Sequence, residues 1–97
     1  MEILFSYGTL QDSKVQKEVF GRHVTGISDV LDGYETEVII IEGTTYPRAI
    51  PMPHSSLQGT RYILSQSELE KCDVYEGTEY ARIKKVLKSG IEAWVYI

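Results

Sequence analysis

The spacing of the β-type segments limits most strongly the fold that this chain can adopt. Six segments have the apolar, β-rich composition of strands, at residues 2–7, 22–32, 34–42, 59–64, 80–87 and 91–97. After the first of them, the strands follow one another too closely for the helical crossovers that parallel βαβ units need. Strands also outnumber helices. The sequence therefore predicts an α+β fold, with a small curled, barrel-like sheet and two helices.

The second predicted helix has the clearest start signal in the chain. Ser65 and Glu68 have the spacing of a capping box, and Leu64 and Leu69 occupy the two positions of a hydrophobic staple. Gly77 suits the end of this helix. The two strand segments that follow predict a hairpin, which turns at residues 89–90.

The first helix and a proline-rich segment are predicted in the first half of the chain. Ser13 and Gln16 have the spacing of a capping box, and Gly21 suits the position after the last turn. Residues 46–53 contain all three prolines. Because proline cannot donate to a sheet ladder, we expect this segment to be an edge segment or a loop.

The composition argues against several classes of protein. With 97 residues, of which 42% are hydrophobic and 25% charged, the chain is predicted to form one domain over residues 1–97. A net charge of −4 without a basic stripe argues against nucleic-acid binding. No apolar run approaches the 18 or so residues of a membrane span, so we expect no membrane association.

The cysteine usage favours a reducing compartment. Cys72 is the single cysteine, and no Cys/His spacing resembles a zinc site, so neither a disulfide nor a metal is expected. Residues 1–5 lack the basic start and apolar length of a signal peptide. We therefore expect a cytoplasmic protein, and its strand edges would permit a monomer or a weak homodimer. His23 and His54 are expected at the surface or in turns.

One carboxylate of the second helix points in an unexpected direction. Glu76 lies seven positions after Leu69, about 20° away on a helical wheel, and so points toward the apolar side. Cys72 lies on that side too, where core packing is favoured over a nucleophilic role. A carboxyl group desolvated at a pocket wall has a pKa above its reference of about 4.3, which suits proton transfer near neutrality. More solvated directions are expected for Glu68, Glu70 and Lys71.

Other interpretations of Glu76 stay open at this point. The residue is also compatible with a place beyond the true helix end, with full exposure, or with an ion pair to Arg48, Arg61 or Arg82. Asp73 is the nearest other carboxylate. It lies on the neighbouring turn, too close for a paired-carboxylate mechanism of the glycosidase type, so we expect it to bond to nearby backbone or to an arginine.

The turn between the first strand and the first helix is the second candidate site. It has the sequence Tyr7-Gly8-Thr9-Leu10, in which the glycine permits close approach of a ligand. Successive N–H groups near a helix start can bind an anion such as a carboxylate. A single glycine usually indicates only a tight bend, and the segment matches neither a phosphate-binding loop nor a serine elbow. Tyr80 follows Glu76 closely enough to share its pocket.

Together these segments resemble the γ-glutamylcyclotransferase-like superfamily, in its avirulence-induced-gene and γ-glutamylamine cyclotransferase group. Residues 7–10 resemble the YGxL signature of that superfamily, and residues 72–82 resemble its LDxxEGxxYxR segment. Cys72 stands where the family usually has leucine. Three further segments match in order and type, at residues 46–47, 58–62 and 93–96.

The resemblance implies a curled mixed sheet flanked by helices, with one pocket at its mouth. It implies that Glu76 is the acid–base residue. It further implies that the substrate is bound by Tyr7, Gly8, Thr9, Leu10 and Tyr80. The implied reaction needs no cofactor and cyclises the γ-glutamyl group of a small amine or peptide to 5-oxoproline. The alternatives are a non-catalytic module that binds a small carboxylate or a protein and, less favoured, a related hydrolase or acyltransferase.

Overall fold

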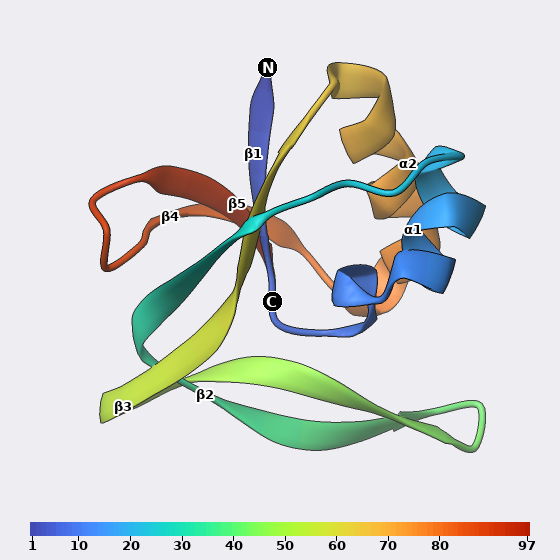
Figure 1. Cartoon of the computed structure of the whole chain (residues 1–97). Helices are drawn as coiled ribbons and strands as arrows, with labels where there is room; N and C mark the ends of the chain where they lie inside the picture. Colours follow the sequence, from blue (N-terminus) through green and yellow to red (C-terminus); the bar gives the residue numbers. More distant parts are fainter.

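A curled five-stranded mixed sheet carries two helices on one side (Figure 1). The computed structural model describes residues 1–97. Its elements are β1 (Glu2–Ser6), η1 (Thr9–Gln11), α1 (Ser13–Phe20), β2 (Ile27–Ile41), β3 (Thr44–Leu64), α2 (Gln66–Glu76), η2 (Gly77–Glu79), β4 (Arg82–Val86) and β5 (Glu92–Tyr96). The strand order is β2-β3-β1-β5-β4, and only β1 and β5 run parallel. The α+β prediction is confirmed.

β2 and β3 form one long hairpin instead of separate short strands. They pair from Ile27 opposite Arg61 to Ile41 opposite Thr44, with a register shift near Gly33. The sequence predicted two strands that are separated at Gly33. In the structure this position is instead an irregularity within β2, where Gly33 adopts a φ of 82°. The proline-rich segment belongs to β3. There β3 has no neighbour except β2, because β1 pairs only with residues 60–64, so the edge-segment prediction is confirmed.

The N-cap of α1 lies one residue before the predicted one. Asp12 is the N-cap, and its carboxylate accepts a hydrogen bond from the backbone N–H of Lys14 at 2.7 Å. The predicted capping box of Ser13 and Gln16 is wrong, because Asp12 is an equally good capping residue and lies at the start of the turn. Gln16 is buried instead. Its side chain donates to the carbonyl of Leu10 and accepts from the N–H of Val24, each at 2.9 Å.

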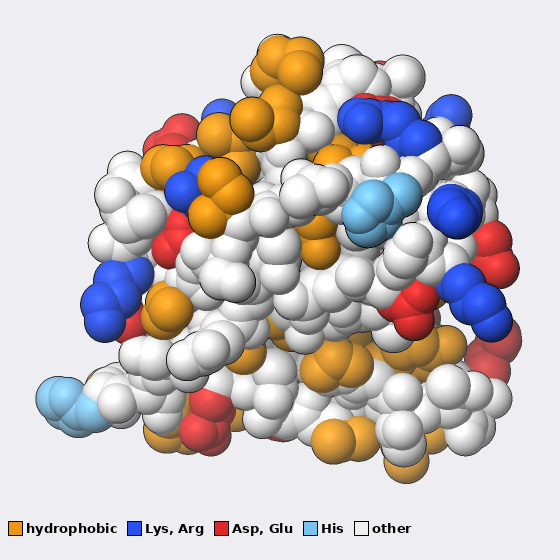
Figure 2. All heavy atoms as spheres, viewed as in Figure 1, with side chains coloured by type: hydrophobic (Ala, Val, Ile, Leu, Met, Phe, Trp, Pro, Cys, Tyr) orange, Lys and Arg blue, Asp and Glu red, His pale blue; other side chains and the backbone are white.

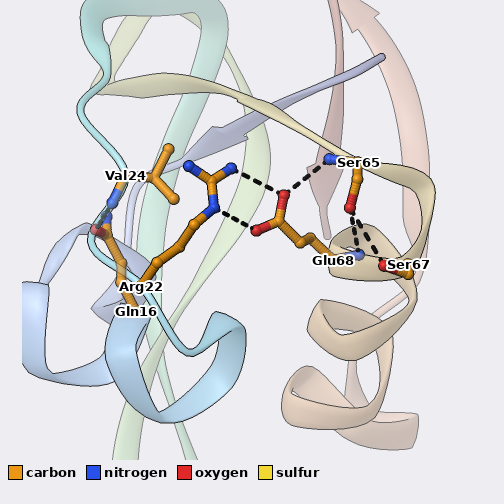
Figure 3. A network of polar contacts seen from close by, with 6 residues as sticks. All are labelled: Gln16, Arg22, Val24, Ser65, Ser67 and Glu68. Atoms are coloured by element: carbon orange, nitrogen blue, oxygen red, sulfur yellow. Dashed lines mark hydrogen bonds and ion pairs between the residues drawn. The ribbon is translucent and has the colours of Figure 1, made fainter.

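The capping box of α2 is confirmed and is part of a larger polar network (Figure 3). The Ser65 hydroxyl accepts from the Glu68 N–H at 3.1 Å, and a Glu68 oxygen accepts from the Ser65 N–H at 2.9 Å. Arg22 donates two further hydrogen bonds to the same carboxylate, at 2.7 and 3.0 Å. The expected solvated direction of Glu68 is therefore wrong. The residue is only 8% exposed, because Arg22 comes across from the end of α1 to cover it.

The core has two parts, one on each face of β1. Leu4 packs with Leu64, Leu69 and Cys72 under the helices, whereas Phe5 packs inside the curl of the sheet. Adjacent residues reach both parts because successive side chains of a strand point to opposite faces. Cys72 is fully buried in this core, which confirms the predicted packing, and burial raises the pKa of its thiol to about 12, which disfavours a nucleophilic role.

The surface is mixed in charge. On the face shown in Figure 2, acidic and basic side chains are interspersed, and the two histidine side chains lie at the surface. His23 and His54 are both exposed, as predicted. No helix of the structure has the length and apolar character needed to cross a membrane.

Replacing Glu68 with glutamine is expected to destabilise the fold in a pH-dependent way. Hydrogen bonds from Arg22 hold the pKa of Glu68 at about 2, below its ordinary 4.5, so the charged form stabilises the folded state above pH 4.5. That contribution disappears as the pH falls through about 2. Urea unfolding should show a loss of about 1 kcal/mol at neutral pH that shrinks in acid. Glu70→Gln, an exposed change on the same helix, should show no difference, and a pH-independent loss in Glu68→Gln would contradict the prediction.

Candidate functional site

The turn after β1 and the end of α2 meet at a small pocket of about 40 Å³. Tyr7, Gly8 and Thr9 line it from the turn. Glu76 and Tyr80 line it from the end of α2 and the segment beyond. The structure thus brings together five of the six residues predicted for the site, although they come from segments about 70 positions apart.

Leu10 is the exception. Its side chain is 1% exposed and packs in the core between the helices and the sheet. An apolar side chain at this place in the η1 turn is directed inward, so Leu10 offers a ligand only its backbone. The first hydrogen bond of the turn runs from the Gln11 N–H to the Gly8 carbonyl at 3.2 Å. The N–H groups of Thr9 and Leu10 come before this first bond, so the turn itself supplies no acceptor for them.

Glu76 lies at the last position of α2, in helical conformation, and is partly buried. Burial raises its pKa from 4.5 to about 7. No arginine forms an ion pair with it, since Arg82 pairs with Asp73 at 3.1 Å and Arg61 pairs with Asp29 at 2.9 Å. The three alternatives of a place beyond the helix, full exposure and an ion pair are therefore wrong. The carboxylate instead lines a pocket and has no charged partner.

Asp73 is committed to a structural role. Its carboxylate pairs with Arg82, as predicted, and accepts a hydrogen bond from the Tyr96 hydroxyl at 2.7 Å. Arg82 also stacks over the Trp94 ring, 4.3 Å from its centroid. These contacts attach the last turn of α2 to β4 and β5. They hold the helix end, and Glu76 with it, against the sheet.

The two predicted tyrosines present their rings to the pocket because their hydroxyl groups bond to backbone. Tyr7 donates to the carbonyl of Tyr96 at 2.6 Å and accepts from the N–H of Ala49 at 3.1 Å. Tyr80 donates to the carbonyl of Pro47 at 2.6 Å. Burial raises the pKa of Tyr7 to about 12 and also raises the pKa of Tyr80. Neither phenol can therefore exchange a proton near neutral pH, whereas Glu76 can.

Sequence reasoning missed several residues of the pocket wall. Tyr46, Pro47 and Tyr96 line it, and Ser6 accepts a hydrogen bond from the Gly8 N–H at 3.3 Å, which fixes the turn. Residues 46–47 were part of the family resemblance, so a signal for them existed. Tyr96 belongs to the matched segment at residues 93–96, so a signal existed for it too, although only the pairing of β5 beside β1 brings it to the pocket.

A second, larger hollow of about 320 Å³ opens beside this pocket. The two share Thr9, Tyr46, Glu76 and Tyr80, so Glu76 lies at their boundary. We call the first the inner pocket and the second the outer groove. Tyr75 lines the outer groove, and its hydroxyl group forms a 2.7 Å hydrogen bond with the Thr9 hydroxyl group. This bond joins the turn directly to the helix residue next to Glu76.

A known plant protein has a sequence similar to that of this chain. AIG2-like protein A of Arabidopsis thaliana is 30% identical to this chain over 81 residues. The aligned part covers 82% of this chain and 48% of that protein, so the chain spans about half the length of the curated relative that it matches.

The fold also occurs in solved structures. Solution structures of two Arabidopsis thaliana proteins match over 99% of this chain. One has a TM-score of 0.83 at 24% identity, with 67% of its own chain covered. The other has a TM-score of 0.81 at 22% identity, with 61% of its own chain covered. A structure named Gamma-glutamyl cyclotransferase matches with a TM-score of 0.79 at 13% identity, over 99% of this chain and 65% of that one. At such identities these matches show the fold alone. The family described as "Gamma-glutamyl cyclotransferase, AIG2-like" matches residues 4–97, and the chain therefore belongs to that family.

Proposed function

We propose that this protein is a γ-glutamylcyclotransferase that releases 5-oxoproline from γ-glutamyl derivatives of small amines or peptides. One observation carries the proposal: Glu76 is an unpaired carboxylate with a pKa near 7 at the wall of a pocket that also contains the turn at residues 7–9. An acid–base group works best when its pKa lies near the working pH. Membership of the family supports the same reaction.

Glu76 would act first as a base and then as an acid. Its carboxylate takes a proton from the α-ammonium group of the substrate, and the free amine attacks the γ-carbonyl carbon to form a five-membered ring. The resulting tetrahedral intermediate then loses the original amine, because the C–N bond to that amine breaks. Glu76 returns its proton to this leaving nitrogen, and the ring nitrogen gives up its second proton to the departing amine, which leaves as an ammonium ion. The products are 5-oxoproline and the amine, and the carboxylate is regenerated.

The rest of the pocket supplies position and polarity. In this proposal the N–H groups of Thr9 and Leu10 donate to the α-carboxylate of the substrate or to the oxyanion that develops on the γ-carbonyl. Both reacting groups belong to one molecule, so holding it in a folded conformation supplies much of the rate. The rings of Tyr7 and Tyr80 form walls that limit access of water to Glu76.

The direct test is mass spectrometry of 5-oxoproline after incubation with a panel of γ-glutamyl amines and dipeptides. Formation of 5-oxoproline with release of the matching amine would support cyclotransfer. Glutamate in place of 5-oxoproline would indicate a hydrolase, and transfer to a second amine would indicate an acyltransferase. Saturable binding of these compounds without any product would instead indicate a binding module on the same scaffold.

The pH dependence of kcat/KM is expected to follow the ionisation of Glu76. The carboxylate form is the base, so activity should be full above the pKa of about 7 and should fall as Glu76 becomes protonated. Below about pH 6 the decline should approach tenfold per pH unit. Initial rates at subsaturating substrate, measured across the acid limb, check this. If the acid limb of the kcat/KM profile had its midpoint near pH 4.5, the ordinary pKa of a glutamate, the base would not be desolvated and the prediction would be wrong.

Tyr75→Phe should weaken catalysis without unfolding the protein. The change removes the 2.7 Å hydrogen bond between Tyr75 and Thr9, which holds the turn against α2. Loss of one such bond is worth about 1 kcal/mol, or about fivefold in kcat/KM. Thr9→Val should have a similar effect, Thr9→Ser should retain activity, and the double variant should lose no more than either single variant. Additive losses would show that the two hydroxyl groups act independently.

A further inference from the structure

Three consecutive residues of β3 hold the tyrosine walls of the inner pocket. The carbonyl of Pro47 accepts the hydrogen bond from the Tyr80 hydroxyl group at 2.6 Å, and the N–H of Ala49 donates to the Tyr7 hydroxyl group at 3.1 Å. These backbone groups are available because this part of β3 pairs with β2 on one side only. Arg48 lies between the two in the chain and contacts the same wall with its side chain.

The side chain of Arg48 contacts the segment beyond α2 at two points. Its terminal amino group donates a hydrogen bond to the backbone carbonyl of Glu79, at the end of η2. Its guanidinium carbon lies 5.5 Å from the centroid of the Tyr80 ring, which is within the range of a cation–π contact. No carboxylate forms an ion pair with Arg48. The two contacts hold Glu79 and Tyr80, which are adjacent in the chain, against β3.

This arrangement leaves one donor of Arg48 without an acceptor. The Nε atom is buried and forms no hydrogen bond. Buried donors are nearly always paired, because an unpaired donor loses its bonds to water and gains nothing in return. An aliphatic side chain of similar length would fill the same space without this loss. The stability of the fold therefore does not explain an arginine here, whereas its attachment to η2 and to the Tyr80 ring does.

The Tyr80 ring separates two spaces that Glu76 also borders. Tyr80 and Glu76 both line the inner pocket and the outer groove. Movement of the ring away from β3 would open the inner pocket toward the groove and admit water to the Glu76 carboxylate. Burial alone raises the pKa of Glu76 to about 7. The proton affinity that the proposed reaction needs thus depends on this wall remaining closed.

We infer that Arg48 is a positioning residue, which holds Tyr80 and η2 in place as the wall that excludes water from Glu76. The inference rests on the proposed function in that it takes Glu76 as the acid–base group. Arg48 lines neither the inner pocket nor the outer groove. Its effect on the reaction is therefore indirect and passes through Tyr80.

A carboxyl NMR titration of the free protein tests the inference without any substrate. The side-chain carboxyl shift of Glu76, followed from about pH 4 to about pH 9, gives its pKa. Arg48→Met fills a similar volume but removes the hydrogen bond to Glu79 and the contact with the Tyr80 ring. We expect the Glu76 midpoint of about 7 to fall by about one pH unit as water enters. An unchanged midpoint would overturn the inference.

The sign of the shift separates this role from a simple effect of charge. Removing a nearby cation raises the pKa of a carboxylic acid, whereas opening the wall lowers it. A raised midpoint in Arg48→Met would therefore also overturn the inference. Lys14→Met is the matched control, because it removes one positive charge from an exposed position on α1 and should leave the midpoint unchanged. Arg48→Lys keeps the charge and its attraction to the Tyr80 ring, and should retain most of the wild-type value.

The other titratable groups around Glu76 are the same in the wild-type protein and in the variant. They are Tyr7, Tyr46, Tyr80 and Tyr96 at the inner pocket, Glu42, Tyr75 and Glu79 at the outer groove, and Cys72 on the preceding turn of α2. Burial raises the pKa of Tyr7, of Tyr80, of Tyr96 and of Cys72, so these groups keep their protons in the titrated range. The difference between the two titrations therefore reports the wall.

Unfolding measurements accompany the titration. The urea midpoint of Arg48→Met should match that of the wild-type protein, because the lost contacts and the relief of the unpaired Nε offset each other. Arg48→Gln, which is shorter and uncharged, provides the same test if the methionine variant does not fold. The Glu76 midpoint should fall in this variant as well, and an unchanged value would overturn the inference.

An activity measurement separates this inference from the reaction itself. If the protein releases 5-oxoproline, the acid limb of kcat/KM in Arg48→Met should move to lower pH by the same amount as the NMR midpoint. An unchanged NMR midpoint in an active protein would overturn the inference and leave the proposed function in place. A lowered midpoint in a protein that releases no 5-oxoproline would refute the reaction and still support the role of Arg48 in shielding Glu76.

Discussion

Glu76→Gln is expected to reduce the release of 5-oxoproline by about 10²- to 10⁴-fold, which is the usual contribution of a general acid–base group. Glutamine has nearly the same shape as glutamate but cannot exchange a proton near neutral pH. The pocket and the substrate contacts should therefore persist, and the loss should fall on kcat. Steady-state assays of 5-oxoproline by mass spectrometry give the answer. Equal activity in the variant would end the assignment of Glu76.

Stability measurements distinguish this loss from unfolding. Glu76 has a folded pKa of about 7 against an ordinary 4.5, so the wild-type protein loses stability as the pH rises through this range. Glu76→Gln lacks that penalty. The variant should match wild type near pH 4.5 and should exceed it by about 2 kcal/mol at about pH 8, allowing for partial solvent access. Asp73→Asn, one turn away, should instead be less stable than wild type, because it weakens the contacts to Arg82 and Tyr96.

Gly59→Ala is expected to be the most destabilising of the substitutions considered. A Cβ atom at this position would lie 2.6 Å from Cζ of Phe5 and would overlap the carbonyl oxygen of Ser6. Both neighbours belong to β1, so the strand itself would have to move. We expect a loss of about 3 kcal/mol and a fall in Tm of about 15 °C by calorimetry. Activity should fall too, because Ser6 fixes the turn of the inner pocket.

Gly33→Ala is the matched control for this effect. Gly33 has a φ of 82°, but a Cβ atom there would meet nothing within 4 Å. The cost should therefore be conformational strain alone, about 1 kcal/mol. Similar losses at the two glycines would show that contact with β1 is not what excludes a side chain at residue 59.

The features that the sequence predicted correctly are those encoded by neighbouring residues. The capping box at Ser65 and Glu68 lies within one turn, and the direction of Glu76 follows from helical periodicity within α2. The start of α1 was displaced by one residue because Asp12 and Ser13 both suit a helix cap. Local patterns thus determine the elements well and their ends less well.

What the sequence missed depends on partners that are remote along the chain. The burial of Glu68 requires Arg22, 46 residues earlier. The length of the β2–β3 hairpin depends on cross-strand register, which no single segment contains. The same holds for the outer groove, which forms only where the hairpin turn at Glu42 approaches η2. The fold class and the partly buried position of Glu76 were therefore predictable, whereas the shape of the candidate site was not.

The hydrogen bond between Tyr7 and the carbonyl of Tyr96 spans 89 positions and joins the first strand to the last. Such contacts have the highest loop-closure cost in a chain, and their formation is slow compared with that of helices and hairpins. During synthesis, the proposed catalytic centre cannot assemble until residue 96 has left the ribosomal exit tunnel, although Glu76 and its helix emerge earlier. Tyr96 is also buried in the core under the helices, so the helical half and the proposed catalytic centre would be completed by the same last strand.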